Sequence, residues 1–197
     1  MGIRDRNNKI ITIISGLPRS GTSMMMKMLE AGGMKVLVDN IRKPDADNPG
    51  GYYEYEKVKK IKDDKSWLNK AEGKAVKMVS ELLFYLPDNR NYKVIFMQRK
   101  IEEIIASQNK MLEGIGKTKG GVSEVMLAKL FEKHLAGIYN WLKIKENIEV
   151  LYIHYNNIIN YPLSNAIRIK NFSSDINILE VGKMVNVLAA TLYRQRR

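Results

Sequence analysis

The stretch of residues 10–28 constrains the fold more than any other part of the chain. Residues 10–14 are apolar and largely β-branched, which predicts a buried strand. A loop rich in glycine and serine follows, and the breaker-free apolar residues 24–31 predict a helix that ends at Gly32. This is the layout of a phosphate cradle, because glycines let backbone N–H groups turn inward and a helix N-terminus adds unpaired donors. An ordinary strand, turn and helix is the alternative.

The loop has the glycine spacing of a nucleotide-binding P-loop but places its cation elsewhere. In the pattern G-x4-G-K-[ST] a lysine follows the second glycine. Here Gly16 and Gly21 match, Thr22 replaces that lysine, and Arg19 lies inside the loop. The sequence P-R-S-G-T-S resembles the 5′-phosphosulfate loop of sulfotransferases that use 3′-phosphoadenosine 5′-phosphosulfate (PAPS), above all the tyrosylprotein and bacterial branches. The resemblance implies that six loop residues bind the nucleotide, with the backbone donors of residues 19–23 holding its 5′-phosphate: Pro18, Arg19, Ser20, Gly21, Thr22 and Ser23.

Composition narrows the classes of partner without naming one. The chain has 197 residues, 45% of them hydrophobic, which suits a single domain over residues 1–197. Its formal net charge of +12 favours anionic partners, although a lysine-rich solvated surface gives the same excess. The absence of cysteine excludes disulfides and is compatible with the cytoplasmic location that we expect. The apolar run after the polar N-terminus is too short for a signal peptide or a membrane span.

Three carboxylates after the first helix are candidates for chemistry. Residues 35–39 predict a second strand ending in Asp39, which is either a magnesium ligand of a nucleotide hydrolase or kinase, or a turn residue. Residues 53–70 predict a helix whose first turn holds Glu54 and Glu56, where carboxylates complement the helix dipole. Tyrosylprotein sulfotransferases carry a catalytic glutamate in a similar place. The resemblance therefore makes Glu54 the candidate general base, ahead of Glu56 and Asp39.

Residues 73–80 predict a third strand, which resembles the sulfotransferase strand that ends in K-T-H. In that alignment Lys77 matches the lysine, while Val79 falls on the catalytic histidine. The missing histidine moves the task of the base to a carboxylate. Lys77 either reaches the transferred sulfuryl group or points to solvent.

A second phosphate-binding pattern follows the predicted fourth strand, residues 92–99. Arg99 ends this strand, residues 100–113 predict an amphipathic helix, and Ser107 lies eight positions after Arg99. The pattern resembles the 3′-phosphate site of sulfotransferases, R-x7-S. A guanidinium at a strand end can fork onto phosphate oxygens, and a serine hydroxyl in the next helix can donate to the same group.

The segments after this helix carry weaker signals. Residues 114–121 contain G-K-T, but no strand precedes them, so we expect a flexible loop or a lid over the acceptor rather than a P-loop. Residues 122–145 predict a long helix on which His134 is half-exposed. Two histidines and no cysteine in the whole sequence argue against a zinc site.

The C-terminal part predicts one more strand, residues 148–154. The residues that follow resemble the sulfotransferase segment Y-E-D-L-x-x-x-P, with Asn156 and Asn157 in place of the two acids. The basic residues 192–197 are either a nucleotide-contacting tail or a frayed end.

Taken as a whole, the resemblance implies an α/β fold of the P-loop type, a three-layer sandwich with a parallel sheet of about five strands flanked by helices. It implies in-line transfer of a sulfuryl group from PAPS to an acceptor hydroxyl or amine, without a metal ion. Arg19 would neutralise the leaving phosphate, Glu54 would deprotonate the acceptor, and Arg99 with Ser107 would hold the 3′-phosphate. The acceptor is a small molecule, a glycan or a protein, and no specific nucleic acid is expected.

Two other functions remain open on the sequence. A nucleotide kinase or hydrolase would use Asp39 and magnesium, although the lysine of the P-loop is missing. A non-catalytic module would hold a nucleotide or an anionic polymer through its basic surface. Neither the acceptor nor the oligomeric state follows from the residues.

Overall fold

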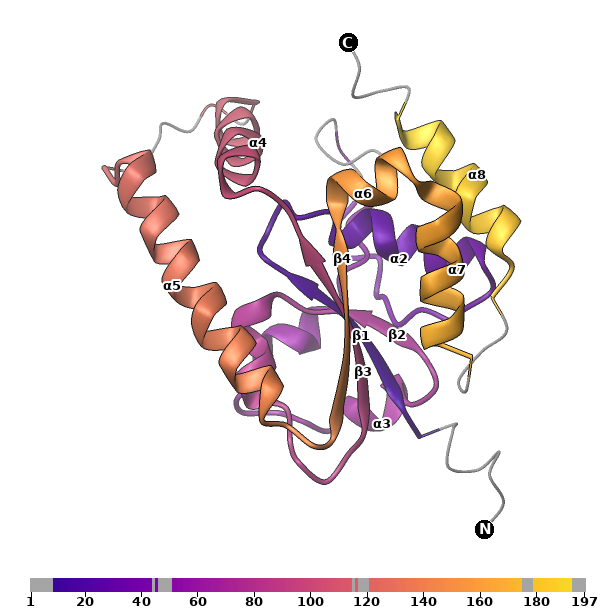
Figure 1. The fold of residues 1–197 in the computed structure, drawn as a ribbon. Helices are drawn as coiled ribbons and strands as arrows, with labels where there is room; N and C mark the ends of the chain where they lie inside the picture. The colour runs from indigo at the N-terminus through magenta and orange to yellow at the C-terminus, as the bar shows by residue number, and fades with distance from the viewer. Residues whose placement is uncertain are drawn as a thin grey trace.

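The four parallel strands of the sheet end on the same side. The structure, a computed structural model, describes residues 9–43, 45, 51–114, 116, 121–174 and 179–192. All strand pairs are parallel and the order is β2-β1-β3-β4, so the carboxyl ends of the strands meet at the same edge (Figure 1). The four strands are β1 (Ile11–Gly16), β2 (Ala75–Lys77), β3 (Tyr92–Gln98) and β4 (Ile148–His154).

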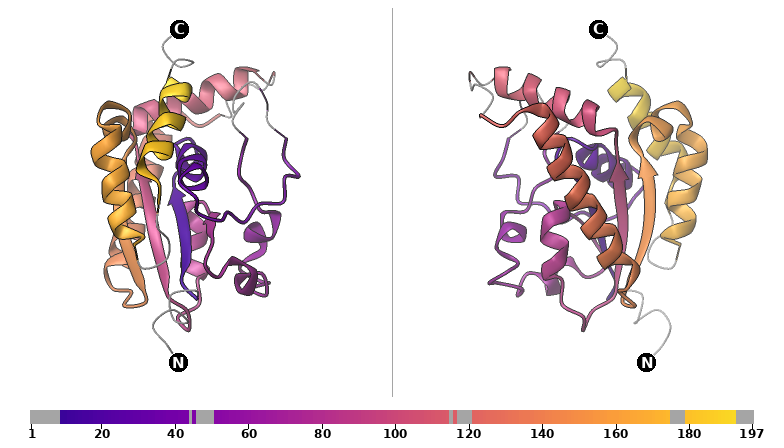
Figure 2. Two further views of the ribbon diagram at one scale, coloured as in Figure 1. Left: turned by 90° about the vertical axis from the view of Figure 1, so that its right-hand side faces the viewer. Right: turned by 60° about the vertical axis from the view of Figure 1, so that its left-hand side comes forward.

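Helices cover both faces of this sheet, which confirms the predicted three-layer α/β architecture. One face packs against α2 (Thr22–Ala31), α6 (Tyr155–Asn160), α7 (Pro162–Phe172) and α8 (Val181–Leu192). The other face packs against α5 (Glu124–Lys143) and the short helices η1 (Glu56–Lys60), α3 (Leu68–Ala71) and η2 (Ser80–Tyr85). Helix α4 (Ile101–Gly114) packs against α5 beyond the carboxyl edge of the sheet (Figures 1 and 2).

The central strands are buried on both faces, which is why they read as unbroken apolar runs. All six residues of β1 are buried. The side chains of Ile11 and Ile13 belong to the core under α5, and that of Ile14 belongs to the core under α2. Strand β4 lies at the edge of the sheet, and Glu149 and His154 on it are exposed.

The second predicted strand does not form, so the sheet has four strands rather than about five. Residues 35–39 make only an isolated bridge between Val36 and Ala75, and the Leu37 N–H donates to the Ala75 carbonyl at 2.8 Å. The backbone then leaves the sheet, because Asp39 N–H donates to the Glu54 carbonyl at 3.2 Å and Asn40 has a left-handed φ of 56°. The third predicted strand, residues 73–80, is shorter in the structure, where it is β2 (Ala75–Lys77).

The predicted helix over residues 53–70 is wrong. Tyr53 has a left-handed φ of 53°, Tyr55 is extended, and only η1 and the four-residue α3 are helical in this region. The apolar spacing explains the difference. Val58 and Ile61 are buried three residues apart, which suits one 3₁₀ turn, but Asp64 and Lys65 follow where an α-helical stripe would continue.

The later helices agree with the sequence more closely, except at the C-terminus. Helices α4 and α5 lie within two residues of their predicted ends, while α8 was not predicted. Helix α8 packs on α2 so closely that a Cβ on Gly32 would lie 2.8 Å from Met184 Cγ. Most of the loop 114–121 and residues 193–197 lie outside the described residues, so the predicted lid and basic tail remain predictions. Among the described helices, none is long and apolar enough to cross a bilayer.

Candidate functional site

The loop between β1 and α2 needs glycine at both ends. Gly16 has a φ of 145°, and a Cβ there would lie 2.5 Å from the Met97 carbonyl oxygen of β3. Gly21 has a φ of 99°, and a Cβ there would lie 2.6 Å from Tyr155 Cδ2 at the start of α6. Left-handed backbone and close approach both exclude other side chains, so the spacing of the two glycines follows from the fold.

The interior of the loop combines a strained backbone with unpaired hydrogen-bonding groups. Arg19 has a left-handed φ of 70°, which is uncommon outside glycine. Ser20 is fully buried, and its hydroxyl has no hydrogen-bond partner among the described residues. Gly21 is the N-cap of α2 and no side chain caps the helix, so the amides of its first turn remain available to a ligand. Pro18 is exposed and Thr22 is partly exposed beside these groups.

The two predicted phosphate elements contact each other directly. Arg19 Nε donates to Ser107 Oγ at 3.0 Å, although the two residues are 88 positions apart. Arg99 Nη1 donates to the Arg19 carbonyl oxygen at 3.1 Å. The structure therefore brings Arg19, Arg99 and Ser107 together at the end of β3.

Arg99 is held in place by neighbours that the sequence did not suggest. Arg99 Nε donates to Glu103 Oε2 at 2.9 Å, and the guanidinium carbon lies 4.3 Å from the centre of the Tyr155 ring. Asn156 Nδ2 donates to the other oxygen of Glu103 at 2.8 Å. Burial raises the pKa of Glu103, but the hydrogen bonds from Arg99 and Asn156 outweigh it, so the pKa lies below its ordinary value. The i,i+4 spacing of Arg99 and Glu103 was the one sequence signal available.

Lys77 turns toward the loop, so the alternative that it points to solvent is wrong. Its side chain is 12% exposed. Lys77 Nζ donates to Ser23 Oγ at 3.3 Å and to the Tyr52 carbonyl oxygen, and it lies 3.6 Å from Glu54 Oε1. Ser23 Oγ also donates to the Tyr52 carbonyl at 3.2 Å. Strand β2 thus joins the start of α2 to the segment that carries Glu54.

Glu54 lies among three cations and outside η1, so the alternative in which it complements a helix dipole does not hold. Besides Lys77, Arg42 Nη1 lies 3.0 Å from Glu54 Oε1 and Lys59 Nζ lies 3.3 Å from Oε2. The Arg42 guanidinium also stacks 3.4 Å above the centre of the Tyr52 ring. Burial raises the pKa of Glu54, but the cations outweigh it, Lys77 most, and the pKa lies below its ordinary value. Glu54 is therefore an ionised carboxylate at neutral pH.

The buried Lys77 predicts a specific pH dependence of stability. Burial lowers the pKa of Lys77 to about 8, whereas a lysine in an unfolded chain titrates near about 10.4. Between these values the unfolded state binds more protons, so the free energy of unfolding gains a contribution that increases with pH. Denaturant titrations should show wild type gaining about 2 kcal/mol relative to Lys77→Met from about pH 8 to about pH 10.5.

Lys57→Met is the matched control for this measurement, because Lys57 is exposed on η1. Its stability difference from wild type should be flat over the same range. A flat difference for Lys77→Met as well would mean that Lys77 titrates like an exposed lysine.

Asp39 has a structural role in this arrangement. Its carboxylate accepts hydrogen bonds from the backbone N–H groups of Ile41 at 3.1 Å and Glu56 at 2.6 Å. Glu56 in turn pairs with Lys59 at 2.6 Å. Within the described part of the chain, no group of three histidine or carboxylate side chains is placed to hold a metal ion.

The sheet order explains why the site has two sides. Strand β1 lies between β2 and β3, so Lys77 at the end of β2 and Arg99 after β3 flank the glycine loop from opposite directions. One side carries Glu54 and Lys77, and the other side carries Arg99 and Ser107. This separation is what a ligand with two distant functional groups would require.

A histidine approaches β2 from another element. His134 on α5 is partly exposed, as predicted, and its Nε2 lies 2.8 Å from the hydroxyl of the buried Ser80. Ser80 directly follows Val79, the position of the missing histidine. The hydroxyl of Ser80 is buried, so this pair anchors α5 to η2.

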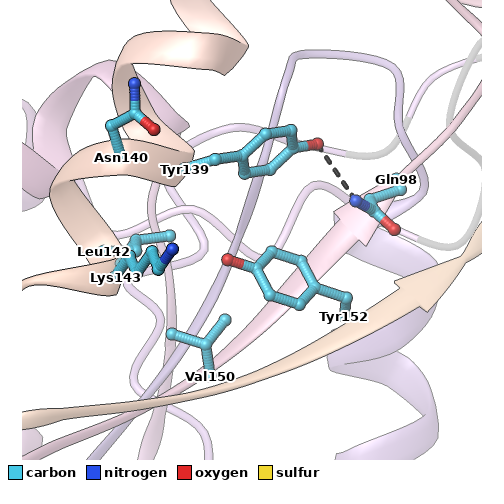
Figure 3. A pocket seen from close by; sticks show the side chains of 7 residues that line it. All are labelled: Gln98, Tyr139, Asn140, Leu142, Lys143, Val150 and Tyr152. Carbon is cyan, nitrogen blue, oxygen red and sulfur yellow. Dashed lines mark hydrogen bonds between the residues drawn. The ribbon is translucent and has the colours of Figure 1, made fainter.

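An open recess of about 510 Å³ lies on the α5 side of β4 (Figure 3). Tyr139 and Tyr152 meet edge to face in its lining, with ring centres 5.6 Å apart, and Gln98 Nε2 donates to the Tyr139 hydroxyl at 3.1 Å. Gln98 directly precedes Arg99, so the recess ends close to the phosphate elements. It is lined by Gln98, Tyr139, Asn140, Leu142, Lys143, Val150 and Tyr152.

No protein-family model and no curated protein sequence matches the chain. Among solved structures, the sulfotransferase domain from the curacin biosynthetic pathway is similar, with 13% sequence identity and a TM-score of 0.46. The match covers 95% of this chain and 91% of that chain. A likeness of this size assigns no residue, ligand or reaction to the protein.

Proposed function

We propose that this protein transfers a sulfuryl group from PAPS to an acceptor hydroxyl or amine. The observation that carries the proposal is the direct contact between the glycine loop and the R-x7-S pattern, through Arg19, Ser107 and Arg99. The two elements lie together at the carboxyl ends of the strands. Such an arrangement suits a nucleotide that carries one phosphate on the 3′ position and another on the 5′ position of its ribose.

The residues of the loop fit the 5′ end of such a nucleotide. The buried, unpartnered Ser20 hydroxyl and the uncapped first turn of α2 are donors that need an acceptor. PAPS would supply the activated sulfuryl group. Arg19 would neutralise charge on the phosphate that leaves, and Arg99 with Ser107 would bind the 3′-phosphate.

The opposite side of the loop suits the acceptor. Glu54 is ionised and can accept a proton from a hydroxyl or amine. Lys77 already bonds to Ser23 at the loop, so it can reach an anionic group held there. A Lys77 drawn toward such a group withdraws its charge from Glu54, which raises the basicity of the carboxylate.

The kinase or hydrolase reading is weaker than this one. The carboxylate of Asp39 is engaged by two backbone N–H groups, which explains that residue without a metal ion. The non-catalytic module differs from the proposal only in turnover, and the Glu54 variant considered in the Discussion separates the two.

Calorimetric titration tests the proposal without knowledge of the acceptor. In the absence of magnesium, adenosine 3′,5′-bisphosphate should bind at least about tenfold more tightly than ADP or 5′-AMP, because only the bisphosphate engages Arg99 and Ser107. Equal affinity for ADP, or binding only with magnesium, would remove the basis for the sulfotransferase proposal and return attention to Asp39.

A further inference from the structure

Two helices meet behind the guanidinium of Arg99. Glu103 comes from the first turn of α4, and Asn156 and Tyr155 come from the first turn of α6 at the end of the edge strand β4. These residues and Arg99 form a connected chain: Asn156 donates to Glu103, and Glu103 accepts from Arg99. We propose that Glu103 and Asn156 are positioning residues that hold Arg99 for a ligand phosphate, an inference that rests on the proposed function.

The contacts decide which edge of Arg99 is presented. A guanidinium has five N–H donors in a planar fork. The Nε donor is taken by Glu103 and one Nη1 donor by the Arg19 carbonyl. Within the described residues no hydrogen bond is made by Nη2, so this end of the fork remains for an anion. The Tyr155 ring lies against the fork, with its centre 4.3 Å from the guanidinium carbon, and so restricts the rotation of the fork.

Tyr155 also ties this arrangement to the glycine loop. Its ring occupies the space that a side chain at Gly21 would need, 2.6 Å from an ideal Cβ. The plane of Arg99 and the N-cap of α2 are therefore set by the same aromatic ring. A ligand held by the loop meets an Arg99 that is already oriented, which reduces the cost of ordering on binding.

Asn156 acts through Glu103 rather than on the ligand. An amide donates to the second carboxylate oxygen without adding charge, and so fixes the rotamer of Glu103 while leaving its charge for Arg99. An acid at position 156 would face Glu103 as a like charge and push it from this geometry. An uncharged donor such as this amide therefore suits position 156, whereas an acid does not.

Charge and geometry give opposite expectations for Glu103→Ala. If Glu103 contributed only its negative charge, its removal would strengthen binding of an anionic nucleotide. As a positioning residue, its removal frees Arg99 to rotate. We expect the ratio of affinities for adenosine 3′,5′-bisphosphate over 5′-AMP, measured by calorimetry, to fall about tenfold in Glu103→Ala, with 5′-AMP affinity unchanged. Glu102→Ala is the matched control, because Glu102 is exposed on the same turn of α4.

Asn156→Ala completes a double-mutant cycle. The single change should lower the same ratio by about threefold, and the double variant should be no worse than Glu103→Ala alone, because Asn156 acts only through Glu103. Asn157→Ala is its control, since Asn157 is the exposed neighbour on α6. Equal or tighter bisphosphate binding by Glu103→Ala, or additive losses in the double variant, would overturn the inference. A wild type without preference for the bisphosphate would overturn the proposed function and this inference with it.

Discussion

Replacing Glu54 by glutamine should slow sulfuryl transfer by about 10²–10⁴-fold, the usual contribution of a general base. Glutamine keeps the size of the side chain and can still accept a hydrogen bond from Arg42, but it cannot take a proton. Affinity for adenosine 3′,5′-bisphosphate should stay within about threefold, because Glu54 lies beside Arg42 and Lys77, on the side of the loop away from Arg99. The measurement is release of the bisphosphate from PAPS, with phenol, glucosamine and water offered as acceptors.

Glu56→Gln is the control for this experiment. Glu56 lies two residues away and its carboxylate pairs only with Lys59 among the described residues, so its loss should leave the rate within about twofold. Full activity of Glu54→Gln would mean that another group takes the proton. A wild type that binds the bisphosphate but shows no release above an enzyme-free blank would favour the non-catalytic module.

Replacing Arg99 by alanine should weaken binding of adenosine 3′,5′-bisphosphate by about 100-fold. The reason is the loss of the charge-assisted hydrogen bonds that we propose the guanidinium makes to the 3′-phosphate. Affinity for 5′-AMP should change by no more than about threefold, since that nucleotide lacks the 3′-phosphate that we propose Arg99 binds. Calorimetry with both nucleotides on the same protein gives the two changes separately. The difference between them is the part of the affinity that depends on the 3′-phosphate.

Lys100→Ala is the matched control for Arg99→Ala, because it removes the same charge from an exposed neighbour. Its effect on both nucleotides should be small and equal. Arg99 also donates to the Arg19 carbonyl, so a second outcome is informative. An equal loss of affinity for both nucleotides in Arg99→Ala would show that Arg99 acts by holding the loop rather than by reading a 3′-phosphate.

Local patterns predicted the elements that carry the glycine loop. The apolar run of β1, the spacing of Gly16 and Gly21, and the first helix all depend on neighbours within about ten residues, which a sequence displays directly. The same holds for β3, Arg99 and α4. The prediction of a helix over residues 53–70 was wrong because two local patterns disagreed. The charge pattern suggested a helix start, whereas the apolar spacing supported only one 3₁₀ turn.

The surroundings of the candidate residues were decided by tertiary structure alone. Lys77 is buried because β2 packs beside β1 and faces Ser23, and no local feature of a lysine in a short strand indicates this. Arg42, Lys59 and Lys77 meet at Glu54 only because the chain between them turns back on the sheet edge. Their combined field, rather than the identity of Glu54, keeps its pKa low.

The sequence by itself determined that a glycine loop lies between a buried strand and a helix, and that Arg99 follows another strand with Ser107 eight positions later in the next helix. Only the tertiary structure decided that Ser107 touches Arg19, and that α6 supplies Tyr155 and Asn156 behind Arg99. The physical reason is sheet order. Parallel strands bring their carboxyl ends to one edge whatever their separation in the chain, and side-chain contacts made there carry no local signature.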